Sequence, residues 1–437
     1  MADILDRFSY SPGCAERSLE ALETAFERVP FYRDNWKKYD VGAGASVDER
    51  FAALPLLTKA DMRAAFPGGL IRDDLSLDEG LRGDDIEYTF TSGTTGEKVV
   101  NIWNQKWWHA SEMSSWKLNP ALRALSYPPR QATLASSLNV GIHCEEDLPM
   151  SHRTMGNLLY LNEKINILCW KEFHLKRMAD ELNSYRPTVL EANPFLLARL
   201  CYWAIDNGVS LYSPSVITFT YELPSAMHLA AIRRVFSSAL VSSYGTTETG
   251  FVMDTCEMGL YHQNSDSCRI DFIPLRPEFG GPELGRLAVT TFGNPWSCIV
   301  RFDVGDIVKL HSEGSCACGI GEGLIADSVE GRVTNSTFTV DGGLITTAAA
   351  DRALSDIPGI REYDLVQLTR DSYDLTIVVH GNEKSAQDAA WEKMENLYGA
   401  RGKFSISCAR DLFPGPSGKY RRTHAEFAFD EGALTEK

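Results

Sequence analysis

The sequence has no excess of basic residues. Its 437 residues include 43 lysines and arginines against 59 aspartates and glutamates, a formal net charge of −16. Nucleic acids and anionic membranes are bound through basic surfaces, so this charge argues against both as partners. A nucleotide is not excluded, because a few converging backbone N–H groups can bind phosphate within an acidic protein.

Long apolar runs are missing as well. The chain has no stretch of about 18 apolar residues, so we expect no membrane span. The first ten residues carry Asp3, Asp6 and Arg7 and no apolar segment, so no secretory signal is expected. Ten cysteines are too few for a disulfide scaffold in a chain of this length. We therefore expect a soluble, cytoplasmic protein with reduced cysteines.

The spacing of the common P-loop is also absent, but another stretch suits phosphate. Residues 89–98, TFTSGTTGEK, follow a short predicted strand at 86–88 and contain five hydroxyl side chains, two glycines and a lysine. Glycines let successive N–H groups converge, and the hydroxyl and ammonium groups add donors for polyphosphate oxygens. The stretch predicts a phosphate-binding loop, with an ordinary surface loop as the alternative.

The length and the alternation of predicted elements indicate the fold class. A chain of 437 residues is too long for one core, so at least two domains are expected. Predicted strands and helices alternate, with strands at 132–135, 188–192, 216–219 and 240–243 and helices at 173–184, 195–205 and 225–236. This order is typical of a parallel sheet with crossover helices. We predict an α/β protein with a large N-terminal domain (1–331), built of parallel sheets and crossover helices, and a small mobile α+β C-terminal lid (332–437).

A second polar stretch, at 244–250 (YGTTETG), follows the last of these strands. A carboxylate among hydroxyl donors suits Mg²⁺ held against phosphate oxygens, so two nucleotide-binding loops are predicted. Further along, Asp303 and Asp306 lie at a predicted turn, where either could accept hydrogen bonds from ribose hydroxyls. An Asp-Gly turn without a ligand is the alternative.

Tryptophans gather after the first loop, at Trp103, Trp107, Trp108 and Trp116. The eight-residue spacing of the last two is about two helical turns and favours packing against a core. A flat aromatic pocket for a substrate is the alternative.

In this order the motifs resemble those of the adenylate-forming enzymes, and within them the phenylacetate–coenzyme A ligase branch. The segments that carry the resemblance are Ser92–Lys98, Tyr244–Glu248, Arg301–Asp306, Gly331-Arg332 and Ser417-Gly418-Lys419. The resemblance implies two half-reactions. A carboxylate first attacks the α-phosphate of ATP to give an acyl-adenylate and pyrophosphate. A thiol, usually that of coenzyme A, then displaces AMP.

The resemblance also implies roles for individual residues. The β- and γ-phosphates would be held by the first loop, at Ser92, Gly93, Thr94, Thr95, Gly96 and Lys98. In the second loop, Tyr244 would stack on adenine beside Gly245 and Thr246, Thr247 would touch the α-phosphate, and Glu248 would bind Mg²⁺. Asp306, rather than Asp303, would bind the ribose with help from Arg332. Lys419 would bridge the carboxylate and the α-phosphate, since a positioned cation offsets the repulsion of two anions.

Four metal-ligand side chains form a further candidate site. Cys256, His262, Cys316 and Cys318 supply three thiolates and one imidazole, a set expected for a closed structural zinc site that braces residues 256–318. Some members of the resembling branch have these residues in the same order. A chance pair of reduced cysteines at 316 and 318 is the alternative, and His311 and Cys268 are spare ligands.

The sequence departs from the branch in two places. Residues 333–336 (VTNS) replace the usual acidic pair, and 340–343 (VDGG) replace a loop that helps to form the thiol tunnel. The acceptor could therefore be coenzyme A, an amine or other nitrogen nucleophile, or a carrier-protein thiol. A nucleotide sensor without catalysis is a further alternative.

The acid pocket is unusual too. Its predicted lining is Trp103, Trp108, Asn139, His143, Tyr221 and Glu222, with Trp107 and His109 as further candidates. An aromatic acid is favoured because flat rings pack on tryptophan and tyrosine faces. The branch also implies a homodimer.

Overall fold

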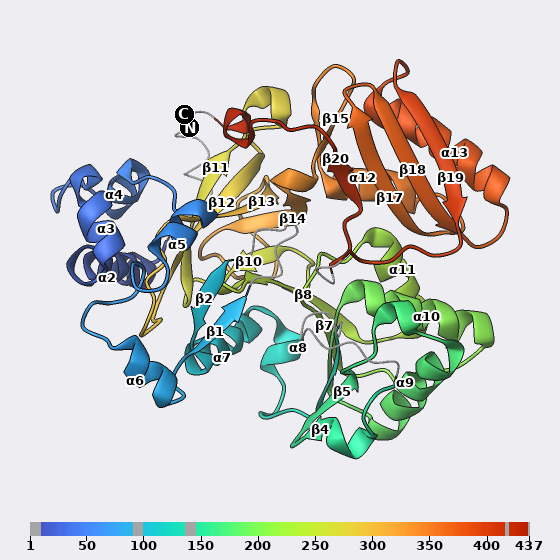
Figure 1. Cartoon of the computed structure of the whole chain (residues 1–437), viewed down its shortest axis with the longest axis horizontal. Helices are drawn as coiled ribbons and strands as arrows, with labels where there is room; N and C mark the ends of the chain where they lie inside the picture. The colour runs from blue at the N-terminus through green and yellow to red at the C-terminus, as the bar shows by residue number, and fades with distance from the viewer. Residues whose placement is uncertain (1–9, 91–98, 136–145, 416–418, 436–437) are drawn as a thin grey trace.

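The computed structural model describes residues 10–90, 99–135, 146–415 and 419–435. Figure 1 shows a large N-terminal part that carries a central sheet and a smaller C-terminal part that packs over it. The central sheet has 12 strands in the order β11-β12-β13-β14-β10-β9-β8-β7-β6-β3-β5-β4. None of the helices in the described ranges has the length and apolarity needed to cross a bilayer.

One half of the central sheet is parallel, as predicted. Its strands are β3 (Gln131–Leu134), β5 (Leu158–Asn162), β6 (Val189–Ala192), β7 (Val216–Phe219) and β8 (Ala239–Thr246). The helices that follow β5, β6 and β7 are α9 (Glu172–Tyr185), α10 (Pro194–Asn207) and α11 (Ala226–Val235). Every residue of β7 is buried, because parallel strands are covered on both faces. The carboxyl ends of these strands therefore point to one edge, where ligands bind in such sheets.

The other half of the sheet is antiparallel. Its strands are β9 (Gly250–Thr255), β10 (Tyr261–Gln263), β11 (Cys268–Pro274), β12 (Leu284–Thr291), β13 (Phe302–Leu310) and β14 (Ile325–Arg332), while the short β4 (Thr154–Met155) closes the far edge.

Two local predictions in this half are wrong. Tyr244, Gly245 and Thr246 belong to β8 and pair with β9, so only the following residues form the turn. A Cβ at position 245 would lie 2.2 Å from the carbonyl oxygen of Gly250, so the strand pair needs glycine there. Asp306 lies in strand β13 rather than at a turn. Gly305, with φ +79°, lets the strand continue at the point where its register with β12 shifts.

The N-terminal part adds helices and one hairpin beside the sheet. These are α2 (Pro12–Arg28), α3 (Pro30–Asn35), α4 (Val47–Ala53), α5 (Lys59–Ala65), α6 (Leu77–Arg82), β1 (Glu87–Phe90), β2 (Val100–Trp103), α7 (Gln105–Ser115) and α8 (Pro120–Arg123). A capping box begins α5, in which Thr58 and Asp61 cap the helix reciprocally. The cap places Lys59 at the first helical position.

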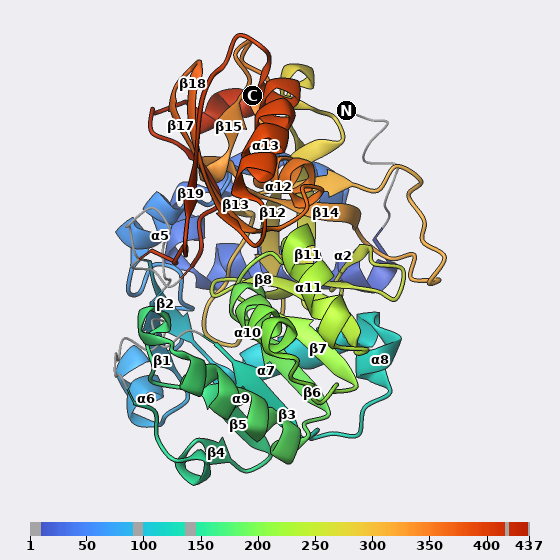
Figure 2. The same cartoon turned by 90° about the vertical axis from the view of Figure 1, so that its right-hand side faces the viewer.

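The C-terminal part has its own four-stranded sheet in the order β19-β18-β17-β20. It contains β15 (Thr337–Phe338), β16 (Leu344–Ile345), α12 (Thr347–Ser355), β17 (Ile360–Thr369), β18 (Ser372–Val379), α13 (Glu383–Tyr398), β19 (Lys403–Ala409) and β20 (Thr423–Ala425). Figure 2 shows α12 and α13 on one face of this sheet. β15 and β16 pair with each other as an antiparallel hairpin.

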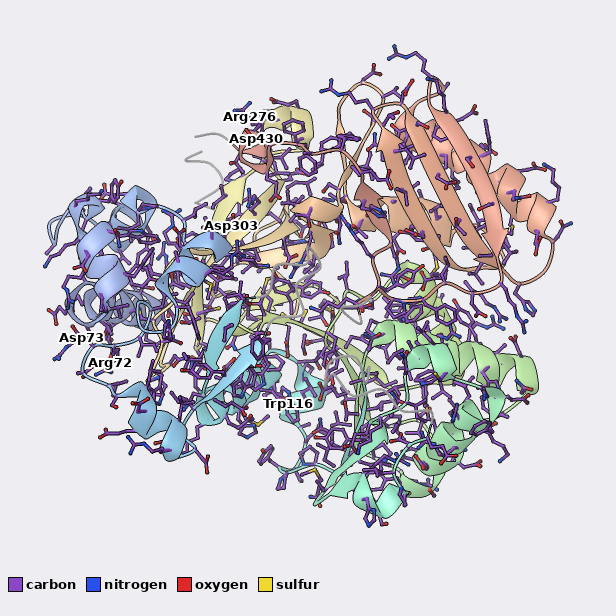
Figure 3. The ribbon with its side chains drawn as sticks, in the orientation of Figure 1. Arg72, Asp73, Trp116, Arg276, Asp303 and Asp430 are labelled. Atoms are coloured by element: carbon purple, nitrogen blue, oxygen red, sulfur yellow. The ribbon has the colours of Figure 1, made fainter. Side chains whose placement is uncertain are left out.

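The chain then returns to the large domain. The backbone N–H of Arg276 donates to the carbonyl of Leu434 at 2.8 Å, and Leu275 pairs with Thr435 in an isolated β-bridge. Figure 3 shows Arg276 beside the segment that contains Asp430. The lid, which begins after Arg332, is thus attached at both of its ends.

Charged side chains join the lid to the large domain. His228 on α11 bonds to Glu362 of β17 (Nε2···Oε2 2.8 Å), and Arg422 bonds to both (3.3 Å to Glu362 and 3.1 Å to His228). All three side chains are buried. The backbone N–H of Ala226 donates to Asp351 of α12 at 2.7 Å. Because these contacts are made between the two parts, the lid is docked in this conformation.

Candidate active site

A cavity of about 770 Å³ lies where the carboxyl ends of the parallel strands meet the lid. Thirteen of the predicted site residues line it: Trp103, Trp108, His109, Tyr221, Glu222, Tyr244, Gly245, Thr246, Thr247, Glu248, Asp306, Arg332 and Lys419. The predicted phosphate loop, Ser92–Lys98, and the pocket residues Asn139 and His143 lie outside the described residues. Segments far apart in the chain therefore share one cavity of a size that suits a small ligand.

The predicted ribose and adenine residues are in direct contact. Tyr244 donates its hydroxyl to Asp306 at 2.8 Å, and the Arg332 Nε lies 3.5 Å from the other Asp306 oxygen. Burial, and then the Asp306 carboxylate, raises the pKa of Tyr244 well above its ordinary value, so the phenol stays protonated and donates. Asp303 is ion-paired with Arg286 and does not line the cavity. The geometry is consistent with Asp306 as the ribose residue.

Lys419 enters the cavity from the lid. Burial, and then the nearby Arg332 guanidinium, lowers the pKa of Lys419, while the carboxylates of Glu222, Asp306 and Glu248 oppose this shift. The segment is held by Glu222, whose Oε1 accepts from the backbone N–H of Tyr420 at 2.9 Å. Glu222 was predicted to line the acid pocket, and the structure adds this anchoring contact.

Lys59 is a second lysine of the cavity wall that the sequence prediction missed. Burial, and then the charge of Arg332, lowers its pKa. Both lysines thus lie beside Arg332, and this side of the cavity is suited to anions.

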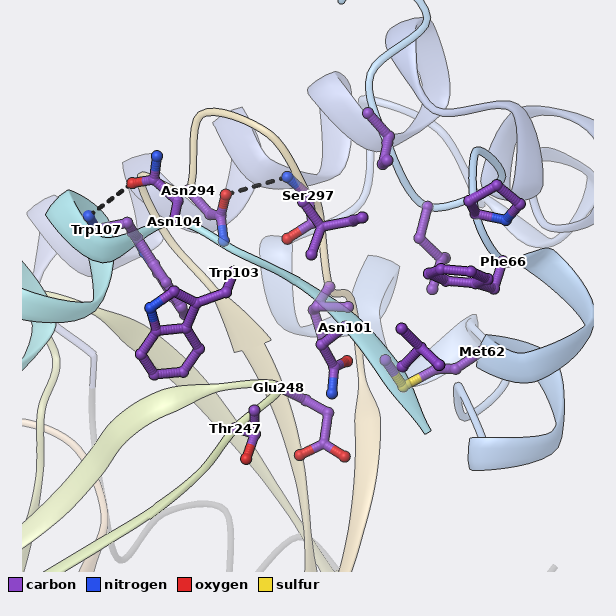
Figure 4. A pocket seen from close by; sticks show the side chains of 16 residues that line it. Met62, Phe66, Asn101, Trp103, Asn104, Trp107, Thr247, Glu248, Asn294 and Ser297 are labelled. Carbon is purple, nitrogen blue, oxygen red and sulfur yellow. Dashed lines mark hydrogen bonds between the residues drawn. The ribbon is translucent and has the colours of Figure 1, made fainter. Parts of the chain in front are cut away.

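A smaller pocket of about 30 Å³ adjoins the large cavity at Thr247 and Glu248. Figure 4 shows the carboxylate of Glu248 facing the side chain of Asn101. Trp107 is another residue of this smaller pocket, and its indole Nε1 donates to the carbonyl of Phe292 at 2.8 Å. Trp107 is buried and does not line the large cavity, so its inclusion in the acid pocket was wrong.

Helix α7 supplies a wall of the cavity that the sequence prediction missed in part. Trp108, Glu112 and Trp116 are spaced by four residues, so they lie on one face, and all three line the cavity. Both tryptophans therefore form part of a cavity wall, which was the alternative interpretation, while Trp116 also packs against the buried cluster of Leu122, Val216 and Val241, as the favoured interpretation predicted. The signal for Glu112 was its place midway between them. Glu191, at the end of β6, is a second missed carboxylate of the wall.

The predicted metal ligands converge. One ligand atom from each of Cys256, His262, Cys316 and Cys318 lies within 4.8 Å of the others. Cys256 Sγ and Cys316 Sγ are 3.8 Å apart, and Cys318 Sγ is 3.4 Å from His262 Nε2. Tetrahedral zinc with bonds of about 2.3 Å to sulfur and about 2.0 Å to nitrogen requires edges of about 3.8 and 3.5 Å. The residues therefore fit a zinc ion.

The spare ligands lie elsewhere. Cys268 is fully buried and bonded to backbone carbonyls, and His311 bonds to Asp327 (Nδ1···Oδ1 2.6 Å). Backbone N–H groups point at the cluster sulfurs instead, including that of Met258 at 3.3 Å from Cys256 Sγ. Such donors stabilise thiolates, which are the zinc-binding form of cysteine.

Comparison with known proteins places the fold. No protein-family model and no curated protein sequence matches the chain. A solved 2-hydroxyisobutyryl-CoA ligase in the postadenylation state, in complex with 2-HIB-AMP, superposes with a TM-score of 0.70 at 15% identity, covering 96% of this chain and 91% of that one. An anthranilate CoA ligase, AuaEII, in complex with anthranoyl-AMP gives 0.52 at 14% identity, covering 77% of this chain and 66% of that one. The amide bond synthetase McbA from Marinactinospora thermotolerans gives 0.51 at 13% identity, covering 77% and 68%.

The chain thus has the fold of the adenylate-forming ligases, which confirms the predicted fold class. The orientation of the lid agrees best with one state. The same 2-hydroxyisobutyryl-CoA ligase gives a TM-score of 0.58 in its open conformation and 0.56 in its thioesterification state, against 0.70 after adenylation. The arrangement of the two parts of this chain is thus more similar to that of the postadenylation structure than to those of the other two.

Proposed function

We propose that this chain activates an aromatic carboxylic acid as an acyl-adenylate with ATP and then transfers the acyl group to coenzyme A. The single observation that carries the proposal is the convergence of Lys419, Glu248 and Asp306 on one cavity from separate parts of the chain. A protein that only binds a nucleotide has no need for a lysine delivered by a second domain.

In the first half-reaction a carboxylate oxygen of the acid attacks the α-phosphorus of ATP, and the bond to pyrophosphate breaks. Lys419 is placed to hold the two anions together, and its ammonium would stabilise the charge that develops on the α-phosphate. Asp306 and Tyr244 would fix the nucleoside. Mg²⁺ on Glu248, when bound, would neutralise phosphate charge. Lys59 lies on the same side of the cavity as Lys419, so its ammonium group is suited to binding the phosphates.

In the second half-reaction the thiol sulfur attacks the acyl carbonyl and AMP leaves, while the thiol proton is released. An amine acceptor would give an amide by the same route, and this is the second candidate. The observation that favours it is the replacement of the tunnel-forming residues at 333–336 and 340–343. McbA, which shares the fold, is an amide bond synthetase. A carrier-protein thiol is a further possible acceptor.

Mass-resolved adenylation tests the proposal. The chain is incubated with ATP, Mg²⁺ and a panel of aromatic acids, with and without coenzyme A, and acyl-AMP, acyl-CoA and pyrophosphate are measured. Acyl-AMP that is converted to acyl-CoA supports the full proposal. Acyl-AMP that persists with coenzyme A but is consumed by an amine moves the acceptor to the second candidate. If no acid yields acyl-AMP or pyrophosphate, the enzymatic proposal is refuted.

We also propose that Cys256, His262, Cys316 and Cys318 bind one structural zinc ion, supported by the match of their spacings to tetrahedral coordination. Elemental analysis of the purified chain should give about one zinc per chain, and Cys318→Ser should lower both zinc content and the unfolding midpoint. Cys408→Ser, in β19 of the lid, is the matched control and should change neither. Equal zinc in wild type and Cys318→Ser would contradict the assignment. The homodimer, the cytoplasmic location and the absence of nucleic-acid partners stay predictions.

A further inference from the structure

One part of the cavity wall is acidic. Glu112 on α7 and Glu191 at the end of β6 both line the cavity, so their exposed surface faces its interior. The Glu191 carboxylate accepts hydrogen bonds from neutral donors, namely Thr220 Oγ1 at 2.9 Å, Gln131 Nε2 at 3.1 Å and the Tyr221 hydroxyl. These bonds hold the carboxylate in place but bring no positive charge to it.

A third carboxylate lies behind this wall. Asp254 on β9 is fully buried; its Oδ2 accepts from Ser115 at 3.1 Å, and the Ser243 hydroxyl also interacts with its carboxylate. Burial, and then the charges of Glu191 and Asp254, raises the pKa of Glu112 to about 8. The three groups are thus close enough to affect one another electrostatically.

Among the residues that the structure describes, the lysines and arginines of the cavity wall are Lys59, Arg332, Lys419 and Arg422, and the last of these is bonded to Glu362 of the lid. Lys59, Arg332 and Lys419 interact with the nucleotide-side carboxylates, and none of them contributes to the shift of Glu112. One imidazole comes near: His109 Nδ1 is 3.6 Å from Glu112 Oε2, and its Nε2 bonds to the Tyr127 hydroxyl at 2.7 Å. A single imidazole does not balance three carboxylates. In the described part of the cavity, one region therefore combines lysine and arginine side chains with carboxylates, and the other contains carboxyl groups with no lysine or arginine beside them.

Such a charge distribution is complementary to a zwitterion. Buried carboxylates without cations are costly, and a bound cation would offset that cost. The acidic region is flanked by Trp108, Trp116 and Tyr160, whose ring faces attract ammonium groups as well as aromatic rings. We propose that the acid activated by this chain carries a nitrogen that is protonated at neutral pH, which binds between Glu112 and Glu191 while the carboxylate points to Lys419. This inference rests on the proposed function and specifies its substrate class.

Matched pairs of acids test the inference. The probes are 3- and 4-(aminomethyl)benzoate and 4-(aminomethyl)phenylacetate, each paired with its hydroxymethyl analogue, within the wider panel of neutral aromatic acids. The rate of acyl-AMP formation should favour the amine of a pair. Glu112→Gln and Glu191→Gln should each lower kcat/KM for that amine about 100-fold, since a buried charge pair is broken, and should change the neutral analogue less than about threefold. Glu172→Gln, exposed on α9, is the matched control and should change neither.

A second readout separates recognition from a structural role. Binding of an ammonium beside Glu112 should expel its proton, so calorimetry at pH 7 in two buffers of different ionisation enthalpy should show proton release with the best amine of the panel. Glu112→Gln should abolish that release while retaining the wild-type unfolding midpoint. Preference for neutral acids, or an amine preference that both glutamine variants retain, would overturn the inference and leave the ligase proposal standing. Absence of acyl-AMP with every acid would overturn both.

Discussion

Replacing Asp254 with asparagine should make the protein more stable at alkaline pH. Asp254 is fully buried on β9, and burial raises its pKa from the ordinary 3.8 to about 7, although hydrogen bonds from Ser115 and Ser243 oppose the shift. Between these two values the folded state binds more protons than the unfolded state, so stability falls as the pH rises. Asparagine keeps the shape of the side chain and can accept from Ser115, but it has no charge to bury.

The size of the effect follows from the two pKa values. One pKa unit is worth about 1.4 kcal/mol, so a shift from 3.8 to about 7 costs the folded protein about 2 to 3 kcal/mol between pH 5 and pH 8. The free energy of unfolding of Asp254→Asn, relative to wild type, should therefore increase by this amount across that interval. Removal of the Asp254 charge should also lower the pKa of Glu112, which adds to the gain.

Urea unfolding followed by tryptophan fluorescence at pH 5, 6, 7 and 8 measures this difference. Asp180→Asn, on the exposed face of α9 where Asp180 pairs with Lys176, is the control and should follow the pH dependence of wild type. If Asp254→Asn and wild type lose stability in parallel from pH 5 to pH 8, Asp254 is already ionised or already neutral throughout. The argument from burial would then be refuted, and with it the account of the acidic wall.

Two further predictions concern the lid segment. Lys419→Ala should lower the rate of acyl-AMP formation about 10²- to 10³-fold, by comparison with the loss of one preorganised donor, whereas Lys384→Ala on exposed α13 should not. Because burial lowers the pKa of Lys419, the wild-type rate should fall on the alkaline side below the ordinary lysine pKa of 10.5; a flat profile to that pH would contradict a role for the ammonium. Glu222→Ala removes the acceptor of the Tyr420 N–H and should lower the same rate about tenfold or more at an unchanged unfolding midpoint. An unaffected rate would show that Glu222 does not position the lysine.

Much of the fold was predictable because local and global signals agree. Fully buried parallel strands are continuous apolar runs, as at Val216–Phe219, and polar residues follow where the strands end. The N-terminus of α5 was predictable because Thr58 and Asp61 form a complete capping box within four residues. The expectation that Glu248, Asp306 and Lys419 share one site came from the resemblance of the ordered motifs to the adenylate-forming enzymes, and all three line one cavity.

Other features depend on contacts between residues that are distant in sequence, and the periodicity of the sequence does not predict such contacts. A helical spacing such as Trp108 to Trp116 identifies one face of a helix but not whether that face meets a core or a cavity. The raised pKa of Glu112 comes from burial and then from the charges of Glu191 and Asp254, which are distant in sequence. The extended conformation at Asp306 likewise depends on pairing with neighbouring strands, which overrides the local turn preference of glycine.

The return of residues 430–435 to the large domain changes how the lid can move. A domain joined by a single hinge at Arg332 can rotate freely about it. Here the chain runs from that hinge through the lid and returns to the large domain, where it bonds to the residues that follow β11, so the lid is tethered at both of its ends. The apolar contacts of Leu434 with Leu275, Ile307 and Val333 strengthen this tether. A large rotation of the lid must therefore either break the contacts of residues 430–435 with the large domain or be accommodated by a change of conformation between β20 and Asp430. The length of that stretch, and not the hinge alone, then limits how far Lys419 can withdraw from the cavity.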